Sequence, residues 1–146
     1  MCVFRVKRKA MEKDIEEFIL SADAKALATY ADGNINVVPV SSIKIMYGKI
    51  WLINYYMNKT LFNILKNEKV ALVCWRKMMG YQIKGVASYF VEGENFDEAV
   101  KWIRSVLPER VVKGLIILDP KEIYDISPAK DTREKFLNEQ QSIREI

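Results

Sequence analysis

Residues 26–40 have the sequence ALATYADGNINVVPV, in which two apolar runs flank an Asp-Gly pair. Such a pair between apolar runs is a strong signal for a β-hairpin, because both residues tolerate the positive φ angles of a tight turn. We therefore expect a strand over Ala26–Ala31 and a returning strand over Ile35–Met46. Pro39 lies inside the returning strand and has no backbone N–H to donate, so the strand has an edge position or a bulge there.

The rest of the chain continues this pattern of short apolar runs separated by turns. Apolar residues at helical spacing predict a first helix from about Lys9 to Ser21. Connections of hairpin length favour a six-stranded antiparallel barrel with short helices over a parallel sheet, whose strands would each need a long crossover. After the hairpin we expect, in order, the strand Ile50–Tyr55, a helix over Thr60–Lys66, the strands Val70–Trp75 and Tyr81–Val91, a helix over Phe96–Leu107, and the strand pair Leu115–Leu118 and Ile123–Ile126.

Length and composition fit one domain. The chain has 146 residues, half of them apolar, which is enough for one buried core. We expect a single domain over residues 1–146, with its core at about 9–127 and a charged tail, helical from about Lys130, at 128–146. No apolar run approaches the ~20 residues of a membrane helix, and the first residues lack the apolar core of a signal peptide, so a cytoplasmic protein is expected.

The sequence contains no histidine. This excludes Ser-His and Cys-His nucleophile pairs, histidine-ligated metals and a histidine-held haem. Cys2 and Cys74 are too far apart in the sequence to form a metal-binding or redox spacing, so no metal site is expected.

The formal charge is +4, from 23 Lys and Arg against 19 Asp and Glu, and basic residues gather at Arg5, Lys7, Arg8 and Lys9. Such an arm can contact nucleic acid or anionic lipid, but it is more often a solvated terminus. Because no base-stacking or groove-reading motif accompanies it, we do not expect nucleic-acid binding. A non-catalytic binding module with a basic N-terminal arm stays as an alternative.

The stretch Asn58–Ile64 follows a predicted buried strand and starts a predicted helix. The start of a helix offers unpaired N–H groups and a partial positive charge, and Lys59 adds a full charge. Together with Thr60 or Asn58, it makes a possible phosphate site. On spacing alone, the ordinary interpretation is a solvated lysine beside a threonine cap, because short motifs of this kind recur by chance.

Two further stretches deviate from regular strand sequence. Gly85 lies within a long strand, where glycine marks a bend or a close approach of another group. A bend in the barrel is at least as good an explanation as a ligand contact. Pro39, in the stretch Val38–Ser42, interrupts its strand and leaves backbone groups that can turn toward a planar ligand.

The order of these features resembles the FMN-binding split-barrel superfamily, which includes pyridoxamine 5′-phosphate oxidase and small FMN-binding proteins. The resemblance spans Ile15 to Ile126 and rests on the Asp-Gly hairpin, the proline-bearing strand, Lys-Thr-x-x-Asn-Ile and Lys-Gly-x-Ala. It implies a split barrel that binds FMN and acts as an oxidoreductase or electron-transfer protein. Deazaflavin-dependent reductases share this fold and are an alternative. No side chain stands out as a catalytic acid or base.

The resemblance also implies a set of cofactor contacts and a homodimer, since the sites of this superfamily lie between two protomers. Strands that are apolar on both faces, such as Ile50–Tyr55 and Val70–Trp75, also need more covering than short helices supply. By position, the implied FMN contacts are Lys59 and Thr60 at the phosphate, Val38, Pro39, Val40, Ser41 and Ser42 along the isoalloxazine ring, Asn54 at the end of its strand, and Gly80, Tyr81 and Gln82 toward the flavin of the other subunit.

Two departures from the superfamily bear on the substrate. Val38 stands where vitamin-oxidising members tend to carry an arginine, so the phosphate site has one cation fewer. The tail after Ser127 contains Arg133 and Arg144 but no tryptophan, whereas those members end in a segment with both. Oxidation of pyridoxamine phosphate is therefore not expected, and the sequence indicates no other substrate.

Overall fold

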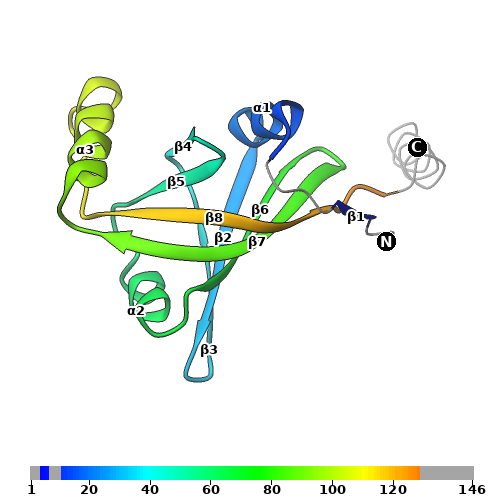
Figure 1. Ribbon diagram of the computed structural model, residues 1–146, viewed down its shortest axis with the longest axis horizontal. Helices are drawn as coiled ribbons and strands as arrows, with labels where there is room; N and C mark the ends of the chain where they lie inside the picture. Colours follow the sequence, from blue (N-terminus) through cyan, green and yellow to red (C-terminus); the bar gives the residue numbers. More distant parts are fainter. Residues whose placement is uncertain (1–3, 7–10, 129–146) are drawn as a thin grey trace, which may run out of the picture.

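The computed structural model describes residues 4–6 and 11–128, which form one antiparallel sheet with three helices around it (Figure 1). Seven strands follow one another in the order β3-β2-β6-β7-β8-β5-β4, and β1 pairs with β8 beside this path. The mainly β, antiparallel architecture with short helices is confirmed. The strands are β1 (Phe4–Val6), β2 (Ala24–Ala31), β3 (Asn34–Pro39), β4 (Ile43–Met46), β5 (Lys49–Asn54), β6 (Lys69–Arg76), β7 (Met79–Phe90) and β8 (Gly114–Asp125), and the helices are α1 (Lys13–Ser21), α2 (Asn58–Lys66) and α3 (Glu94–Val106).

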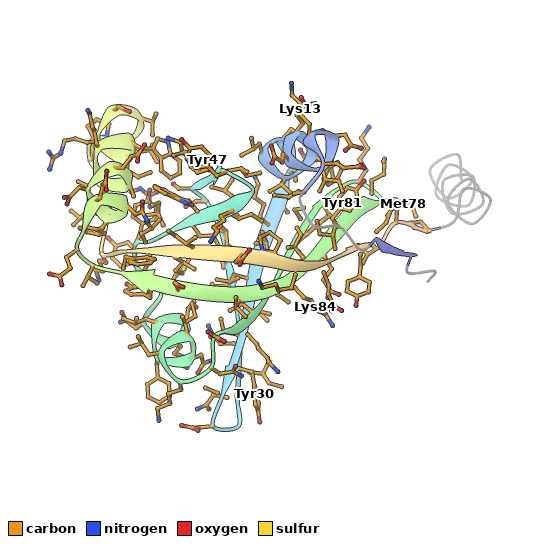
Figure 2. All side chains as sticks on the ribbon, viewed as in Figure 1. Lys13, Tyr30, Tyr47, Met78, Tyr81 and Lys84 are labelled. Carbon is orange, nitrogen blue, oxygen red and sulfur yellow. The ribbon has the colours of Figure 1, made fainter. Side chains whose placement is uncertain are left out.

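The Asp-Gly turn forms as predicted. Asp32 and Gly33 have φ angles of 50° and 82°, and the register pairs Ala31 with Asn34 across the turn. Two consecutive positive φ angles give a hairpin turn whose twist matches that of the flanking strands. Tyr47, at φ 52°, occupies the corresponding position between β4 and β5, where its side chain points outward (Figure 2).

The predicted returning strand over Ile35–Met46 is two strands, β3 and β4. β3 ends at Pro39, and Val40 donates its N–H to Lys25 O at 3.0 Å. Pro39 cannot extend the ladder, so the interruption occurs at the predicted place and separates the two strands.

The predicted last strand pair, in contrast, is one strand, β8. Gly85 of β7 pairs with Pro120 of β8, and the register shifts between Lys84 and Gly85. A bulge of this kind bends a strand without ending it. The Asp-Pro sequence at 119–120 therefore marks a bend, where the sequence suggested a turn.

The predicted count of six strands is too low: the described residues form seven strands along the path, and β1 pairs with β8 beside it. β1 pairs antiparallel with β8, and the register places Val6 opposite Ile123 and Phe4 opposite Asp125. The predicted solvated arm thus includes a strand at Arg5. The helix α1 begins at Lys13, later than the predicted Lys9. Predictions that fall on Cys2, Lys7, Arg8 and the tail with Arg133 and Arg144 lie outside the described residues.

Two apolar clusters make up the core, one inside the curled sheet and one beneath α3. Strand β5 contributes to both: Ile50 and Leu52 lie in the first cluster, and Trp51 and Ile53 lie in the second. Side chains of a strand alternate between its two faces, so α3 covers the outer face of β5 (Figure 1). The two-sided burial of β5 is thus achieved within one chain, and it no longer argues for a second protomer. None of the helices described is long and apolar enough to cross a membrane.

Candidate functional site

The start of α2 presents backbone N–H groups that the helix itself cannot satisfy. Its first hydrogen bond runs from Leu61 N to Met57 O at 2.9 Å. The amides of Asn58–Thr60 precede this bond and have no acceptor within the helix. Met57, the N-cap residue, offers no side-chain cap, and its own N–H donates to Asn54 Oδ1 at 2.6 Å. The first turn is therefore open to an external anion.

Charge distinguishes the first turn of α2 from those of the other helices. α1 carries Asp14 and Glu16 there, and α3 carries Glu94 and Asp97. These carboxylates complement the positive end of the helix dipole and repel an anion. The first turn of α2 has no acidic residue and contains Lys59, which is exposed and forms no ion pair with the described residues. Of the three helix starts, that of α2 suits an anion.

Buried hydrogen bonds hold α2 against the hairpin of β2 and β3. Asn36 Nδ2 donates to Thr60 Oγ1 at 2.9 Å. Asn63 Nδ2 donates to Thr29 Oγ1 at 3.1 Å and to Asn34 O at 3.2 Å. The side chain of Thr60, expected at the phosphate, is fully buried and faces the hairpin. The whole Thr60 residue has no exposed surface, so of the three residues with unbonded amides only Asn58 and Lys59 are exposed.

A cavity of about 380 Å³ lies between β3 and α2. Within the described part of the chain, Asn63 Oδ1 is buried without a hydrogen-bond partner. A buried acceptor of this kind needs a donor from a water or a ligand. The cavity lining includes amide side chains, one cation and two apolar residues, namely Asn36, Asn58, Asn63, Lys59, Ile35 and Phe62.

Residues Val40–Ser42 form a bridging segment across the opening of the sheet. It connects β3 and β4, which stand at the two ends of the strand order. Ser42 O accepts from Ile53 N at 3.4 Å, so the segment is tied to β5 where it enters β4. The predicted ring contacts Val38–Ser42 thus run from one edge of the sheet to the other.

Few side chains in this segment are free to reach a ligand. Ser42 Oγ lies 2.7 Å from Tyr55 Oη, and both side chains are buried. Val40 is also buried, whereas Pro39 and Ser41 are exposed. Backbone groups and the hydroxyl of Ser41 are therefore what this segment can offer.

Asn54 is occupied by internal hydrogen bonds. It is 1% exposed, and its Nδ2 donates to Tyr89 Oη at 2.7 Å while its Oδ1 accepts from Met57 N. Both polar groups of the side chain are engaged. The structure therefore places Asn54 behind the start of α2, as a residue that positions the helix.

The stretch Gly80–Gln82 lies across the sheet from the bridging segment. Gln82 pairs with Val73, Val73 with Ala26, and Ala26 with Pro39, along one row through β7, β6, β2 and β3. Three strand spacings of about 4.8 Å make this row about 14 Å long when it is followed along the sheet. Within one chain, β6 and β2 therefore separate this stretch from the strand that carries Val38 and Pro39.

Gly80 and Tyr81 have fixed positions. Gly80 N donates to Ser127 Oγ at 3.0 Å, and Gly80 O accepts from Ile126 N at 3.1 Å. The ring of Tyr81 packs edge-on against Phe18 of α1, with a centroid distance of 5.1 Å. Both residues therefore present a rigid surface at the start of β7.

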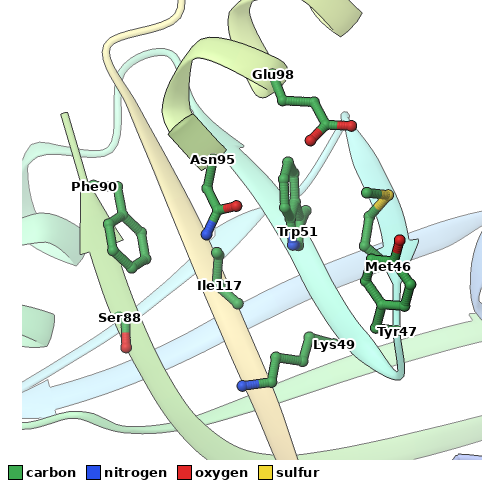
Figure 3. A pocket seen from close by; sticks show the side chains of 9 residues that line it. All are labelled: Met46, Tyr47, Lys49, Trp51, Ser88, Phe90, Asn95, Glu98 and Ile117. Atoms are coloured by element: carbon green, nitrogen blue, oxygen red, sulfur yellow. The ribbon is translucent and has the colours of Figure 1, made fainter. Parts of the chain in front are cut away.

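A second cavity, of about 310 Å³, lies between α3 and strands β4, β5, β7 and β8. Figure 3 shows Glu98 of α3 and Lys49 of β5 at opposite ends of it, with Trp51 between them. The two charged side chains are exposed, and among the described residues neither forms an ion pair. None of the predicted site residues lines this cavity.

Two cations near the start of α2 were not predicted from the sequence as site residues, because they come from the loop between α3 and β8. The Arg110 guanidinium lies 5.2 Å from the ring centroid of Tyr55. The Lys113 ammonium lies 4.9 Å from that of Tyr56. The only local signal is a charged loop ahead of a buried strand, and its partner strand cannot be deduced from spacing.

Cys74 is not a candidate nucleophile. Its side chain is buried in β6, and Sγ lies 3.8 Å from Tyr81 O. Burial raises the pKa of the Cys74 thiol to about 11, so the thiol stays protonated at neutral pH. The described residues also contain no cluster of acidic and cysteine side chains able to hold a metal ion.

Comparison with known proteins gives consistent matches. The family model for pyridoxamine 5′-phosphate oxidase matches residues 11–131. An uncharacterized protein of Methanocaldococcus jannaschii is 38% identical over 104 residues, which is 68% of this chain and 70% of that protein. The structure of HupZ from Group A Streptococcus matches with a TM-score of 0.73 at 21% identity, over 82% of this chain and 96% of that one. An FMN-binding protein of Syntrophomonas wolfei subsp. wolfei matches with a TM-score of 0.69 at 17% identity, over 80% and 86%.

Proposed function

The chain belongs to the pyridoxamine 5′-phosphate oxidase family, and from this premise we propose that it binds FMN and works as an oxidoreductase or electron-transfer protein. The observation that carries the proposal is the start of α2. It is uncapped and free of acidic residues, and it bears Lys59 next to a cavity. A phosphate monoester matches this arrangement, because its oxygens accept from both backbone amides and an ammonium group.

Amide side chains fit the cavity to the rest of the cofactor. Asn36, Asn58 and Asn63 line the same cavity as Lys59. The ribityl chain of FMN carries hydroxyl groups next to its phosphate, and amide groups can donate to and accept from hydroxyls. A cavity lined by a cation and amide side chains therefore suits a ribityl phosphate.

When bound, FMN supplies the hydride or electron transfer. The chain's own groups bind and orient it. The Lys59 ammonium and the amides of Asn58 and Lys59 neutralise the phosphate, and the Asn36–Thr60 hydrogen bond fixes the helix that carries them. Along Val38–Ser42, backbone groups and the Ser41 hydroxyl provide dipoles for the ring, which is the way preorganised donors stabilise developing charge.

The absorbance spectrum of the purified protein tests the proposal directly. We expect flavin bands, with the pigment released on denaturation and identified as FMN. Bands at the shorter wavelengths of a deazaflavin would show that the protein binds that cofactor instead of FMN. A colourless protein that also fails to bind added FMN would support a non-catalytic binding module instead.

Replacing Lys59 by alanine should weaken FMN binding about tenfold or more, because a charge-assisted contact of ~1.5–3 kcal/mol is lost. Riboflavin, which has no phosphate, should lose far less affinity. Titration of the flavin-free protein with each ligand, followed by flavin fluorescence, gives both dissociation constants. Lys66→Ala is the matched control, since Lys66 lies in the last turn of the same helix and pairs with Asp32 at 2.6 Å. An equal loss of affinity for FMN and riboflavin would show that Lys59 does not contact the phosphate.

We also propose that the protein is a homodimer, on the basis of the edge strand β3. Ile35 and Val37 alternate along β3 onto one face and are 80% and 62% exposed. An edge strand with exposed apolar side chains invites pairing or packing with another chain. A dimer would also let Gly80–Gln82 of one protomer approach the bridging segment of the other, without the two intervening strands that separate them within one chain.

Light scattering at micromolar concentration should give twice the monomer mass, and the interface should bury more than about 2,000 Å² in total, as obligate dimers do. Val37→Lys should shift the mass toward the monomer, because it places a charge in the apolar face. The control is Lys84→Ala, on an exposed position of β7. A monomer mass for the unmodified protein would rule out the dimer and the shared site with it.

A further inference from the structure

The loop between α3 and β8 is anchored beside the start of α2. Lys113 N donates to Asn54 O at 2.9 Å, and Arg110 N donates to Leu107 O at 3.0 Å. Asn54 in turn accepts from the N-cap residue Met57. Two consecutive hydrogen bonds thus connect the loop to the open helix start.

Tyr55 lies between Arg110 and the bridging segment. The Arg110 guanidinium lies over Tyr55, and the Tyr55 hydroxyl is bonded to Ser42, the last of the predicted ring contacts. One side chain therefore separates Arg110 from the segment. Residues 34–42 carry no basic side chain of their own, and Arg110 adds a second cation to the Lys59 that lines the cavity beside β3.

The guanidinium of Arg110 keeps its binding capacity. The described residues provide no carboxylate in ion-pair contact with it, although Glu109 precedes it in the loop. Contact with an aromatic face holds a guanidinium through its plane and leaves the N–H groups at its rim available. Such a fork matches the two oxygens of a carboxylate or a phosphate.

We propose that Arg110 is an oxyanion-binding residue of the flavin site, held in place by Tyr55. This inference rests on the proposed function. The bound group is a phosphate or a carboxylate, and it belongs either to the cofactor or to an anionic substrate.

Three variants of the full chain distinguish a cofactor anion from a substrate anion, namely Arg110→Ala, Arg110→Lys and Lys113→Ala. Lys113→Ala is the matched control, because Lys113 shares the loop, the charge and the contact with a tyrosine, but lies on Tyr56. FMN and riboflavin are titrated into the flavin-free variants, and inorganic phosphate is titrated into the FMN-loaded variants by calorimetry. Thermal melts check that each variant is folded.

If the anion is the cofactor's phosphate, Arg110→Ala should weaken FMN binding at least about tenfold and leave riboflavin unchanged. If the anion belongs to a substrate, Arg110→Ala should leave FMN affinity unchanged, and the affinity of the FMN-loaded protein for inorganic phosphate should fall at least about tenfold. Arg110→Lys should give an intermediate loss, since it keeps the charge without the planar fork.

Unchanged FMN and phosphate affinities for Arg110→Ala would overturn the inference. An equal loss of affinity in Lys113→Ala would overturn it as well, because the effect would then come from the general charge of the loop. Failure of the proposed function is a separate result, namely that the unmodified protein binds no flavin. Phosphate is then titrated into the flavin-free chain, where a loss in Arg110→Ala still supports the anion site and no loss overturns it.

Discussion

Gly85→Val should lower the free energy of unfolding by about 3 kcal/mol or more, at the upper end of what overpacking costs. A side chain at residue 85 would overlap the backbone carbonyl of Asp119 in β8 and press on Leu118 Cδ2 at 3.1 Å. Asp119 is paired with Val86 of β7, directly after the residues of β8 that pair with β5, so its carbonyl cannot move aside cheaply. The higher strand preference of valine, worth at most ~1 kcal/mol, cannot offset this.

Chemical denaturation of the flavin-free protein measures the loss of free energy. Thermal unfolding should show a fall in melting temperature of about 10 °C. Ser88→Val, at an exposed position of the same strand, should change stability by less than about 0.5 kcal/mol. An unaltered stability for Gly85→Val would mean that the bulge opens freely. The sequence left a bend or a ligand contact open at Gly85, and the structure identifies the bend.

Asn54→Ala should have the second-largest effect, about 2–4 kcal/mol of stability, together with a loss of FMN affinity. The substitution leaves Tyr89 Oη and the N–H of Met57 without their partners, and each buried unsatisfied group costs ~1–3 kcal/mol. Because Met57 is the N-cap residue of α2, the helix start should lose its fixed position, and FMN should be affected more than riboflavin.

Tyr89→Phe is the matched variant, since it removes the bond to Asn54 Nδ2 but keeps the bond to Met57. It should reduce stability while retaining the preference for FMN over riboflavin. Urea unfolding and flavin titration of both variants test this pair of expectations. A normal preference for FMN in Asn54→Ala would show that Asn54 does not position the phosphate site.

Local chemistry explains which elements the sequence predicts well. The turn at Asp32 and Gly33 depends on two residues that accept positive φ, so its sequence is sufficient. Pro39 likewise interrupts a strand through its own missing N–H. The strand β1 and the continuity of β8 depend instead on pairing with distant segments, which periodicity does not encode.

The same distinction holds for the site. The place of Lys59 at a helix start was predictable, because its charge and the helix start lie within one short stretch, whereas its role at a phosphate came from the resemblance and stays a proposal. The orientation of Thr60 toward Asn36 follows from how α2 packs on the hairpin, and the position of Arg110 follows from the pairing of β8 with β5. Contacts between elements far apart in the chain required the folded structure.

The place of β8 in the strand order also governs how the chain reaches its fold. β8 lies between β7 and β5, so residues up to about Leu118 are needed before the two parts of the sheet are joined. The hairpins β2–β3 and β6–β7 close over short loops and can form early, whereas the β5–β8 and β1–β8 pairs close long ones. Such high contact order slows folding. During synthesis, the unpaired edges of β5 and β7 stay exposed until β8 arrives, which makes this interval the one most open to aggregation.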